Sequence, residues 1–231
     1  MSNISVVIPA LNEEEPIVGV VRECFATNIP TEIIAVDNGS TDRTAERARE
    51  AGARVVSEPR RGYGRACLAG IRAIAPESEI IVFLDGDGSD CPEFINQLVD
   101  PIAAGTYDFV IGSRTRGQRE PGSMNFQQVF AGRLAGWLMS ILYGVRYTDM
   151  CPFRAIRRVA LEKLSMREET YGWNLEMQMK AARAGLRILE VPVNHRCRTG
   201  GVSKVSGTLR GTFAAGGRII STFVRIASSK L

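Results

Sequence analysis

Short apolar runs alternate with longer, mixed stretches over the first 115 residues. Each run is rich in β-branched residues and ends at a polar or glycine-containing turn, which is typical of strands. The stretches between them have the length of helices, and Gly52 can end one of these. The pattern predicts strands at residues 4–8, 32–36, 54–57, 79–84 and 109–112, and helices at residues 14–27, 41–52, 64–75 and 90–104.

Strands that alternate with helices in this way form βαβ units, which build a parallel sheet with helices on both faces. The sequence therefore predicts the α/β class. Ligands bind such sheets at the carboxyl ends of the strands. Polar clusters follow three of the predicted strands, at residues 9–13, 37–40 and 85–90. We expect the functional site at this edge of the sheet.

The pattern changes after residue 115. It predicts a polar loop, a long helix, one more strand and an amphipathic helix, at residues 116–123, 126–143, 187–193 and 208–227. The last helix has apolar side chains on one face and Arg210, Arg218 and Arg225 elsewhere. Because no repeat, low-complexity segment or linker interrupts the chain, we expect one domain over residues 1–231.

Composition excludes several classes of protein. Hydrophobic residues make up 45% of the 231 residues and charged residues 23%, so the chain can bury a large core and is not disordered. The net charge of +4 is too small to indicate a nucleic-acid-binding protein. Residues 192–231 contain Lys and Arg but no Asp or Glu. This bias favours an anionic partner, either phosphate groups or a membrane surface, over a basic face that only aids solubility.

The five cysteines occur singly, without the C-x-x-C spacing of zinc sites, and their odd number argues against a disulfide framework. The first residues lack the basic region of a signal peptide. No apolar stretch reaches the ~20 residues that a membrane-spanning helix needs. We therefore expect a cytoplasmic protein.

The strongest chemical signal follows the most hydrophobic predicted strand, where Asp85 and Asp87 flank one glycine. Two carboxylates this close supply the hard oxygen ligands that Mg²⁺ or Mn²⁺ prefers, and glycine lets a ligand approach the backbone. A polar turn that closes a strand is the alternative. A calcium-binding EF-hand is excluded, because its twelfth position would be Asn96 rather than Glu and a strand precedes the loop.

Four segments resemble the family 2 glycosyltransferases, and they occur in the order of that family: VIPALNE at 7–13, VDNGSTD at 36–42, LDGD at 84–87 and IGSR at 111–114. Two later segments, DMCPFR at 149–154 and RTGGVSK at 198–204, resemble the dolichol-phosphate mannose synthase group. The resemblance implies a GT-A fold, with a Rossmann-like, mostly parallel sheet and helices on both faces, followed here by C-terminal amphipathic helices. It also implies metal-dependent, inverting transfer of a hexose from a nucleotide sugar of the GDP-mannose or UDP-glucose type.

The resemblance assigns roles by position. Residues 1–115 correspond to the nucleotide-sugar-binding half and residues 116–231 to the acceptor half. The donor is expected against Pro9, Leu11, Asn12, Glu13, Asp37, Ser40, Asp85 and Gly86. A divalent metal is expected at Asp85, Asp87 and Ser89, and the catalytic groups are Asp87, Arg114, Arg198 and Lys204. The chain departs from the family pattern at Leu11, Asn38 and Ser89, where an aromatic residue, Asp and Gln are more usual.

The acceptor determines whether the reaction needs a base. A lipid phosphate has a second pKa near ~6 and is largely ionised at neutral pH, whereas a hydroxyl acceptor would need a carboxylate to take its proton. The sequence offers no strongly placed base: His195 is expected to be structural, and Glu176 either approaches the acceptor or pairs with an arginine. This favours a polyprenyl phosphate acceptor over a soluble hydroxyl acceptor.

The two amphipathic helices allow peripheral contact with the cytoplasmic face of a membrane, through apolar side chains and nearby arginines. They could instead pack on the sheet or form a homodimer interface. A nucleotide-sugar-binding protein without activity is a further alternative, although the intact pair of Asp85 and Asp87 counts against it.

Overall fold

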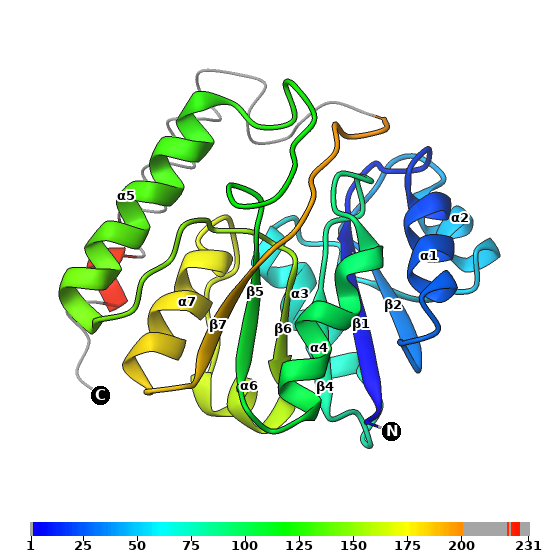
Figure 1. Ribbon diagram of the computed structural model, residues 1–231. Coiled ribbons are helices and arrows are strands. Elements are labelled where there is room, and N and C mark those ends of the chain that lie inside the picture. The colour runs from blue at the N-terminus through cyan, green and yellow to red at the C-terminus, as the bar shows by residue number, and fades with distance from the viewer. Residues whose placement is uncertain (1, 201–220, 222, 227–231) are drawn as a thin grey trace.

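The computed structural model describes residues 2–200, 221 and 223–226 (Figure 1). Seven strands form one sheet in the order β3-β2-β1-β4-β6-β5-β7. The strands are β1 (Ile4–Ala10), β2 (Glu32–Asp37), β3 (Arg54–Ser57), β4 (Ile80–Phe83), β5 (Phe109–Ser113), β6 (Arg154–Arg157) and β7 (Ile188–Pro192). The helices are α1 (Ile17–Ala26), α2 (Thr44–Glu50), α3 (Tyr63–Ala73), the 3₁₀ turn η1 (Pro92–Phe94), α4 (Ile95–Ala103), α5 (Phe126–Tyr143), α6 (Arg158–Leu164) and α7 (Trp173–Arg183).

The sheet is parallel except at β6, which runs antiparallel to both of its neighbours, β4 and β5. Helix α4 lies in front of the sheet and α3 behind it in Figure 1. The sequence predicted this mostly parallel sheet with helices on both faces, but it did not predict β6. Arg154 and Arg157 interrupt the apolar pattern of that strand, although Arg154 is fully buried.

The core follows from the composition of the central strands. Every residue of β1, β4 and β5 is buried, as expected of parallel strands that are covered on both faces. Phe83 of β4 meets the edge of the Trp173 ring, with the ring centroids 6.1 Å apart. Trp173 is therefore a core residue, and the start of α7 packs against β4, the strand that precedes the paired carboxylates.

Helix α5 spans the residues that the sequence predicted, but most of its large apolar side chains do not face the protein. Its buried side is formed by Met139 and three small residues, Gly132, Ala135 and Gly136, and Gly136 lies against the backbone of Tyr147. On the opposite side Phe126, Phe130, Leu134, Trp137, Ile141 and Leu142 are exposed. None of the helices in the described part of the chain has the length and hydropathy to span a bilayer.

Most of the amphipathic helix predicted at 208–227 lies outside the described residues. The described part, residues 221 and 223–226, is helical. Ile226 is buried, and Arg225 places its Nη2 atom 2.8 Å from the Glu168 carboxylate. This end of the segment therefore packs on the domain.

Two glycines provide a matched test of this packing. A Cβ atom at Gly70 of α3 would collide with Val7 of β1 and lie 3.2 Å from Val36 of β2, whereas a Cβ at Gly19 of α1 meets nothing within 4 Å. Gly70→Ala is expected to lower the free energy of unfolding by about 1–3 kcal/mol, because overpacking strains the helix–sheet contact. Gly19→Ala is expected to raise it by up to about 1 kcal/mol through helix propensity. Urea denaturation measures both, and equal effects of the two variants would contradict this packing.

Candidate active site

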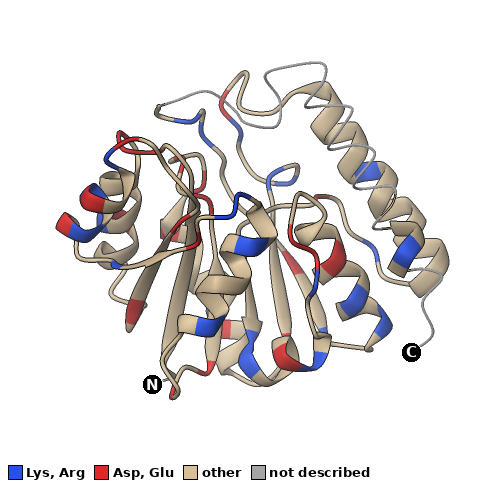
Figure 2. Cartoon of the chain, turned by 180° about the vertical axis from the view of Figure 1, so that it is seen from behind, with Lys and Arg blue, Asp and Glu red and all other residues tan. Residues whose placement is uncertain are grey.

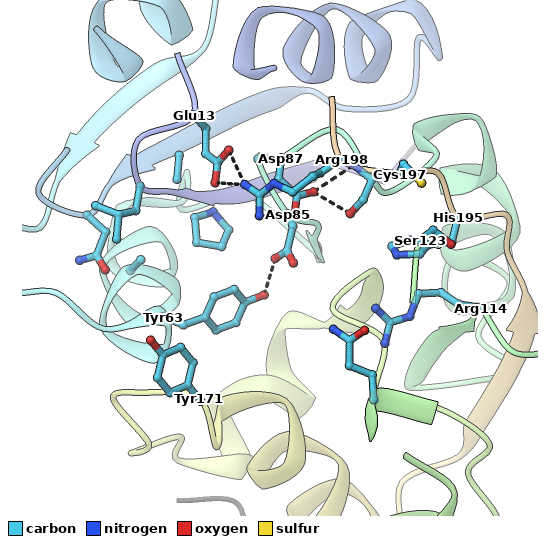
Figure 3. A pocket seen from close by; sticks show the side chains of 18 of the residues that line it. Glu13, Tyr63, Asp85, Asp87, Arg114, Ser123, Tyr171, His195, Cys197 and Arg198 are labelled. Atoms are coloured by element: carbon cyan, nitrogen blue, oxygen red, sulfur yellow. Dashed lines mark hydrogen bonds and ion pairs between the residues drawn. The ribbon is translucent and has the colours of Figure 1, made fainter. Parts of the chain in front are cut away.

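A cavity of about 740 Å³ lies at the carboxyl ends of the central strands (Figure 3). Its walls come from both halves of the chain. Residues of the first half include Pro9, Leu11, Glu13, Asn38, Arg61, Tyr63, Asp85, Gly86, Asp87 and Ser89. Arg114, which follows β5 at the end of the first half, also lines the cavity. Residues of the second half include Ser123, Asn125, Gln128, Tyr171, His195, Cys197 and Arg198.

Asp85 lies two residues after the end of β4 and is held from two sides. Its carboxylate Oδ1 accepts a hydrogen bond from the Tyr63 hydroxyl at 2.9 Å, and its backbone N–H donates to Asp90 Oδ2 at 2.9 Å. Burial, together with the charges of Asp90 and Asp87, raises the pKa of Asp85 well above its ordinary value. Burial and Asp87 also raise the pKa of Asp90 to about 6, although the hydrogen bond from the Asp85 N–H opposes that shift. Carboxyl groups are thus crowded at the end of β4, where a bound cation would favour their ionised form.

Asp87 and Ser89 form a compact oxygen cluster next to Asp85. The backbone N–H and the hydroxyl of Ser89 donate to Asp87 Oδ1 at 3.0 and 2.6 Å. Within residues 2–200 and the short described C-terminal stretch, no group of three His, Cys, Asp or Glu side chains is arranged to hold a metal. A cation at Asp85 and Asp87 would therefore need further ligands from a bound substrate or from water.

Arg198 joins the ends of β1 and β4. Its Nη2 atom donates to both carboxylate oxygens of Glu13, at 2.8 and 2.9 Å, and its Nη1 atom lies 3.6 Å from Asp87 Oδ2. The segment around it is also fixed by its backbone, because the N–H groups of Arg196 and Thr199 donate to the carbonyls of Ser89 and Asp87. Arg198, which the resemblance assigned to catalysis, thus lies directly beside the paired carboxylates.

Arg114 lines the opposite wall, in a fixed orientation. Its Nε and Nη2 atoms each donate to the Asp149 carboxylate at 2.8 Å, and the Asp149 carboxylate also accepts from the Arg114 backbone N–H at 3.0 Å. Burial opposes ionisation of Asp149, yet the charge and hydrogen bonds of Arg114 lower the pKa of this carboxyl below its ordinary value. The pair is therefore charged. No hydrogen bond from Nη1 of Arg114 reaches another described residue, so this atom can bind a ligand.

Three of the predicted donor-binding residues, Asn12, Asp37 and Ser40, do not line the cavity. They connect the loops that follow β1 and β2: the Asn12 N–H donates to the Ser40 hydroxyl, and the Ser40 N–H donates to Asp37 Oδ1. Asn12 Oδ1 in turn accepts from the Thr41 N–H at 2.8 Å. Through these hydrogen bonds they support the cavity wall without lining it. Lys204, predicted to be catalytic, lies outside the described residues.

Asn38 has a role that the sequence did not reveal. Its amide Nδ2 donates to the carbonyls of Glu58 and Arg60, both at 2.9 Å, and its Oδ1 accepts from the Gly62 N–H at 2.8 Å. The side chain is buried and holds the 58–62 loop against the end of β2. An amide, which donates and accepts, is required here, and this explains in physical terms why Asn replaces the more usual Asp.

His195 and Glu176 are both buried. Burial, with a further contribution from Arg114, lowers the pKa of His195 to about 4, so the imidazole is neutral at pH 7. Glu176 Oε2 accepts from the backbone N–H groups of Arg167 and Glu168, and its Oε1 pairs with Lys180 at 3.0 Å. Glu176 therefore orders the loop before α7 and does not line the cavity.

Comparisons with known proteins agree with this architecture. The family described as Glycosyl transferase family 2 matches residues 5–165, more than half of the chain. An uncharacterized glycosyltransferase of Mycobacterium tuberculosis is 37% identical over 92% of this chain and 94% of its own length. A dolichyl-phosphate hexose transferase of Haloferax volcanii is 34% identical over 97% of this chain and 93% of its own length.

A solved structure extends the comparison to three dimensions. The glucosyl-3-phosphoglycerate synthase of Mycobacterium tuberculosis, in complex with Mn²⁺, UDP-glucose and phosphoglyceric acid, matches with a TM-score of 0.79 and 26% identity. The match covers 100% of this chain and 81% of that one. It confirms the GT-A fold that the sequence predicted.

The role of Asn38 can be tested by a single change of atom. Asn38→Asp replaces an amide donor with an oxygen that faces two carbonyls, so we expect the free energy of unfolding to fall by about 1–3 kcal/mol. Asn28→Asp is the matched control, because the exposed Asn28 side chain makes a single hydrogen bond to the described residues, at 3.4 Å. Its cost should stay within about 0.5 kcal/mol. Chemical denaturation at pH 7 compares the two. Unchanged stability of Asn38→Asp would show that the amide does not hold the loop.

Proposed function

This chain belongs to glycosyl transferase family 2, and we propose that it transfers a hexose from a nucleoside diphosphate sugar to a polyprenyl phosphate. The observation that carries the proposal is the meeting of Asp85, Asp87 and Arg198 at one wall of a cavity of about 740 Å³. Paired carboxylates beside a guanidinium suit a metal-bound diphosphate, which carries negative charge and brings its own cation.

The donor is assigned to the wall formed by the first half of the chain. Pro9, Leu11 and Glu13 line the cavity where β1 ends, and Asp85 and Gly86 line it where β4 ends. A nucleoside between these two strand ends would place its diphosphate beside Asp87. Asn12, Asp37 and Ser40 support this wall through the hydrogen bonds that connect the loops. We therefore propose that these three residues maintain the shape of the donor site and do not contact the donor.

The oxygen atoms of Asp85, Asp87 and Ser89 fit Mg²⁺ or Mn²⁺ in their chemistry. The Ser89 hydroxyl lies 2.6 Å from Asp87 Oδ1, so both can contribute to one site. Diphosphate oxygens and water would complete the coordination sphere, as is usual for these ions. When bound, the ion offsets the charge that develops on the leaving diphosphate.

Arg198 is placed to act on the same charge. It lies 3.6 Å from Asp87 and is held in position by Glu13, so it needs little reorganisation to contact a diphosphate. Lys204, six residues further along the chain, is expected to add a second positive charge. Both cations would contribute most as the bond to the leaving group breaks.

The acceptor is assigned to the opposite wall, which is formed by Arg114 and by residues of the second half. Nη1 of Arg114 can bind a phosphate oxygen, while Asp149 fixes the orientation of its guanidinium. An ionised acceptor oxygen forms the new bond to the anomeric carbon, and the bond from that carbon to the diphosphate oxygen breaks on the opposite side. The nucleoside diphosphate leaves with the bonding electrons, and the configuration inverts. No base is required, and His195 would be a weak one, because burial lowers its pKa to about 4.

The apolar side of α5 supports contact with a membrane surface. Asn125 and Gln128, at the start of this helix, line the cavity, and the exposed residues Phe126 and Phe130 begin the apolar side at the same end. Arg133 is the one charged residue of α5, which is largely tan in Figure 2. A helix of this kind can insert its apolar face at the headgroup level and bring the cavity to a lipid-linked phosphate.

A soluble acceptor is the second candidate, and the similar solved structure favours it, because that protein is described in complex with phosphoglyceric acid. The two candidates share the donor site and differ in the molecule that contacts Arg114. A phosphate or carboxylate on a small acceptor could bind the same guanidinium.

One experiment separates the candidates. The wild-type chain is incubated with UDP-glucose or GDP-mannose and Mn²⁺, with either polyprenyl phosphate in anionic liposomes or 3-phosphoglycerate in solution. We expect a hexosylated polyprenyl phosphate by mass spectrometry, and sedimentation with the liposomes that weakens at high salt. Asp87→Ala is expected to lower the rate by a factor of about 100 or more, since an interaction of several kcal/mol with the transition state is lost. The exposed Asp100→Ala serves as the control.

Two results would overturn the proposal. Transfer to 3-phosphoglycerate alone, with the protein left in the supernatant at low salt, would favour the soluble acceptor. Full activity of Asp87→Ala at saturating Mn²⁺ would remove the assigned role of the carboxylate pair.

A further inference from the structure

We propose that Tyr63 is a positioning residue for the transfer reaction: its hydroxyl fixes the Asp85 carboxylate in the orientation that receives the metal-bound donor. The inference rests on the proposed function, because it assigns a role to a neighbour of the donor site. Neither the family resemblance nor the spacing of polar residues along the chain singles out this tyrosine.

The geometry couples Tyr63 to one oxygen of Asp85. The phenol donates to Oδ1 at 2.9 Å, and Figure 3 shows the ring pointing across the cavity wall toward the carboxylate. No other hydrogen bond from a described residue reaches this carboxylate, since the Asp85 contact to Asp90 uses the backbone N–H. Tyr63 therefore determines which oxygen is engaged and leaves Oδ2 available to a ligand.

The need for such a contact follows from the charges around Asp85. Asp87 and Asp90 lie within five residues of it, and all three side chains gather at the end of one strand. Like charges in a buried setting repel, and an aspartate carboxylate rotates readily about its last torsion. A single donor on Oδ1 is thus the restraint that keeps the carboxylate at the cavity wall.

Tyr63 can serve this purpose because its own position is set by backbone packing. It begins α3 between two glycines, and Gly62 has φ of 155°, in the region that favours glycine. A Cβ atom at Gly62 or at Gly64 would collide with the backbone of Glu169 or Glu168. The Arg65 N–H adds a hydrogen bond to the Glu169 carbonyl at 3.0 Å. The start of α3 is therefore clamped against the loop before α7.

The clamp also connects the two walls of the cavity. The loop that presses on Gly62 and Gly64 continues to Tyr171, which lines the cavity from the second half of the chain. Tyr63 therefore connects this loop, which packs against the start of α3, to the Asp85 carboxylate at the donor wall. An aliphatic or phenyl side chain at residue 63 would fill the same space without this link.

The test is Tyr63→Phe, which removes the hydroxyl and keeps the ring. Binding of UDP and of GDP, each with Mn²⁺, is measured by calorimetric titration for the wild type and the variant, together with the thermal midpoint without ligand. We expect binding of the preferred nucleotide to weaken about tenfold or more, as for other hydrogen bonds to charged groups, while the midpoint stays within about 2 °C. Tyr107→Phe, which removes a hydroxyl outside the cavity, is the matched control and should bind as the wild type does.

The outcomes are distinguishable. Wild-type affinity in Tyr63→Phe would overturn the inference and leave the proposed function intact. Weaker binding together with a fall of the thermal midpoint by more than about 2 °C would also overturn the inference. Such a result would show that the hydroxyl stabilises the fold as a whole. If the wild type binds neither nucleotide with Mn²⁺, the proposed function fails and the inference fails with it.

Discussion

Three carboxylates held together at the end of one buried strand are the constraint on which the site depends. Asp85, Asp87 and Asp90 lie within six residues, and burial together with mutual repulsion raises the pKa of Asp85 well above its ordinary value. Such a cluster is stable only where donors and cations surround it. Tyr63, the Asp85 N–H and Arg198 supply them, and each comes from a different part of the chain.

The sheet explains how these parts meet. The parallel strands β1 and β4 end at the same edge and bring Glu13 close to Asp87, so that one guanidinium can contact both. The chain then returns to this edge after β7, where the N–H groups of Arg196 and Thr199 bind the carbonyls of the acidic loop. The donor wall is therefore completed by residues almost 200 positions apart in sequence. A disturbance of the returning segment should affect the donor site as directly as one in β4.

The sequence predicted the parts of this arrangement that local patterns determine. Apolar runs followed by polar turns located β1, β2 and β4, and Asp85, Asp87, Arg114 and Arg198 all line the cavity. Tertiary contacts decided the rest. Arg154 is buried in β6, where it donates to the carbonyls of Cys151 and Asn174, and no local pattern predicts a buried arginine in a strand.

The residues missed or misplaced have the same explanation. The family resemblance assigned Asn12 and Ser40 to the donor, yet the structure uses them to connect two loops. Tyr63 reaches Asp85 across 22 positions, at the start of a helix whose sequence looks ordinary. Such contacts follow from the packing of α3 against the loop before α7, which a single sequence does not disclose.

The central claim is that the carboxylates at the end of β4 receive the donor only together with a divalent cation. Calorimetric titration of the wild-type chain with UDP and GDP, in Mn²⁺ and in EDTA, tests it most directly. The account predicts that one of the nucleotides binds in Mn²⁺ and that its affinity falls by a factor of about 100 or more in EDTA, as expected when an interaction of about 3 kcal/mol or more is lost. Equal affinity in the two conditions would contradict it.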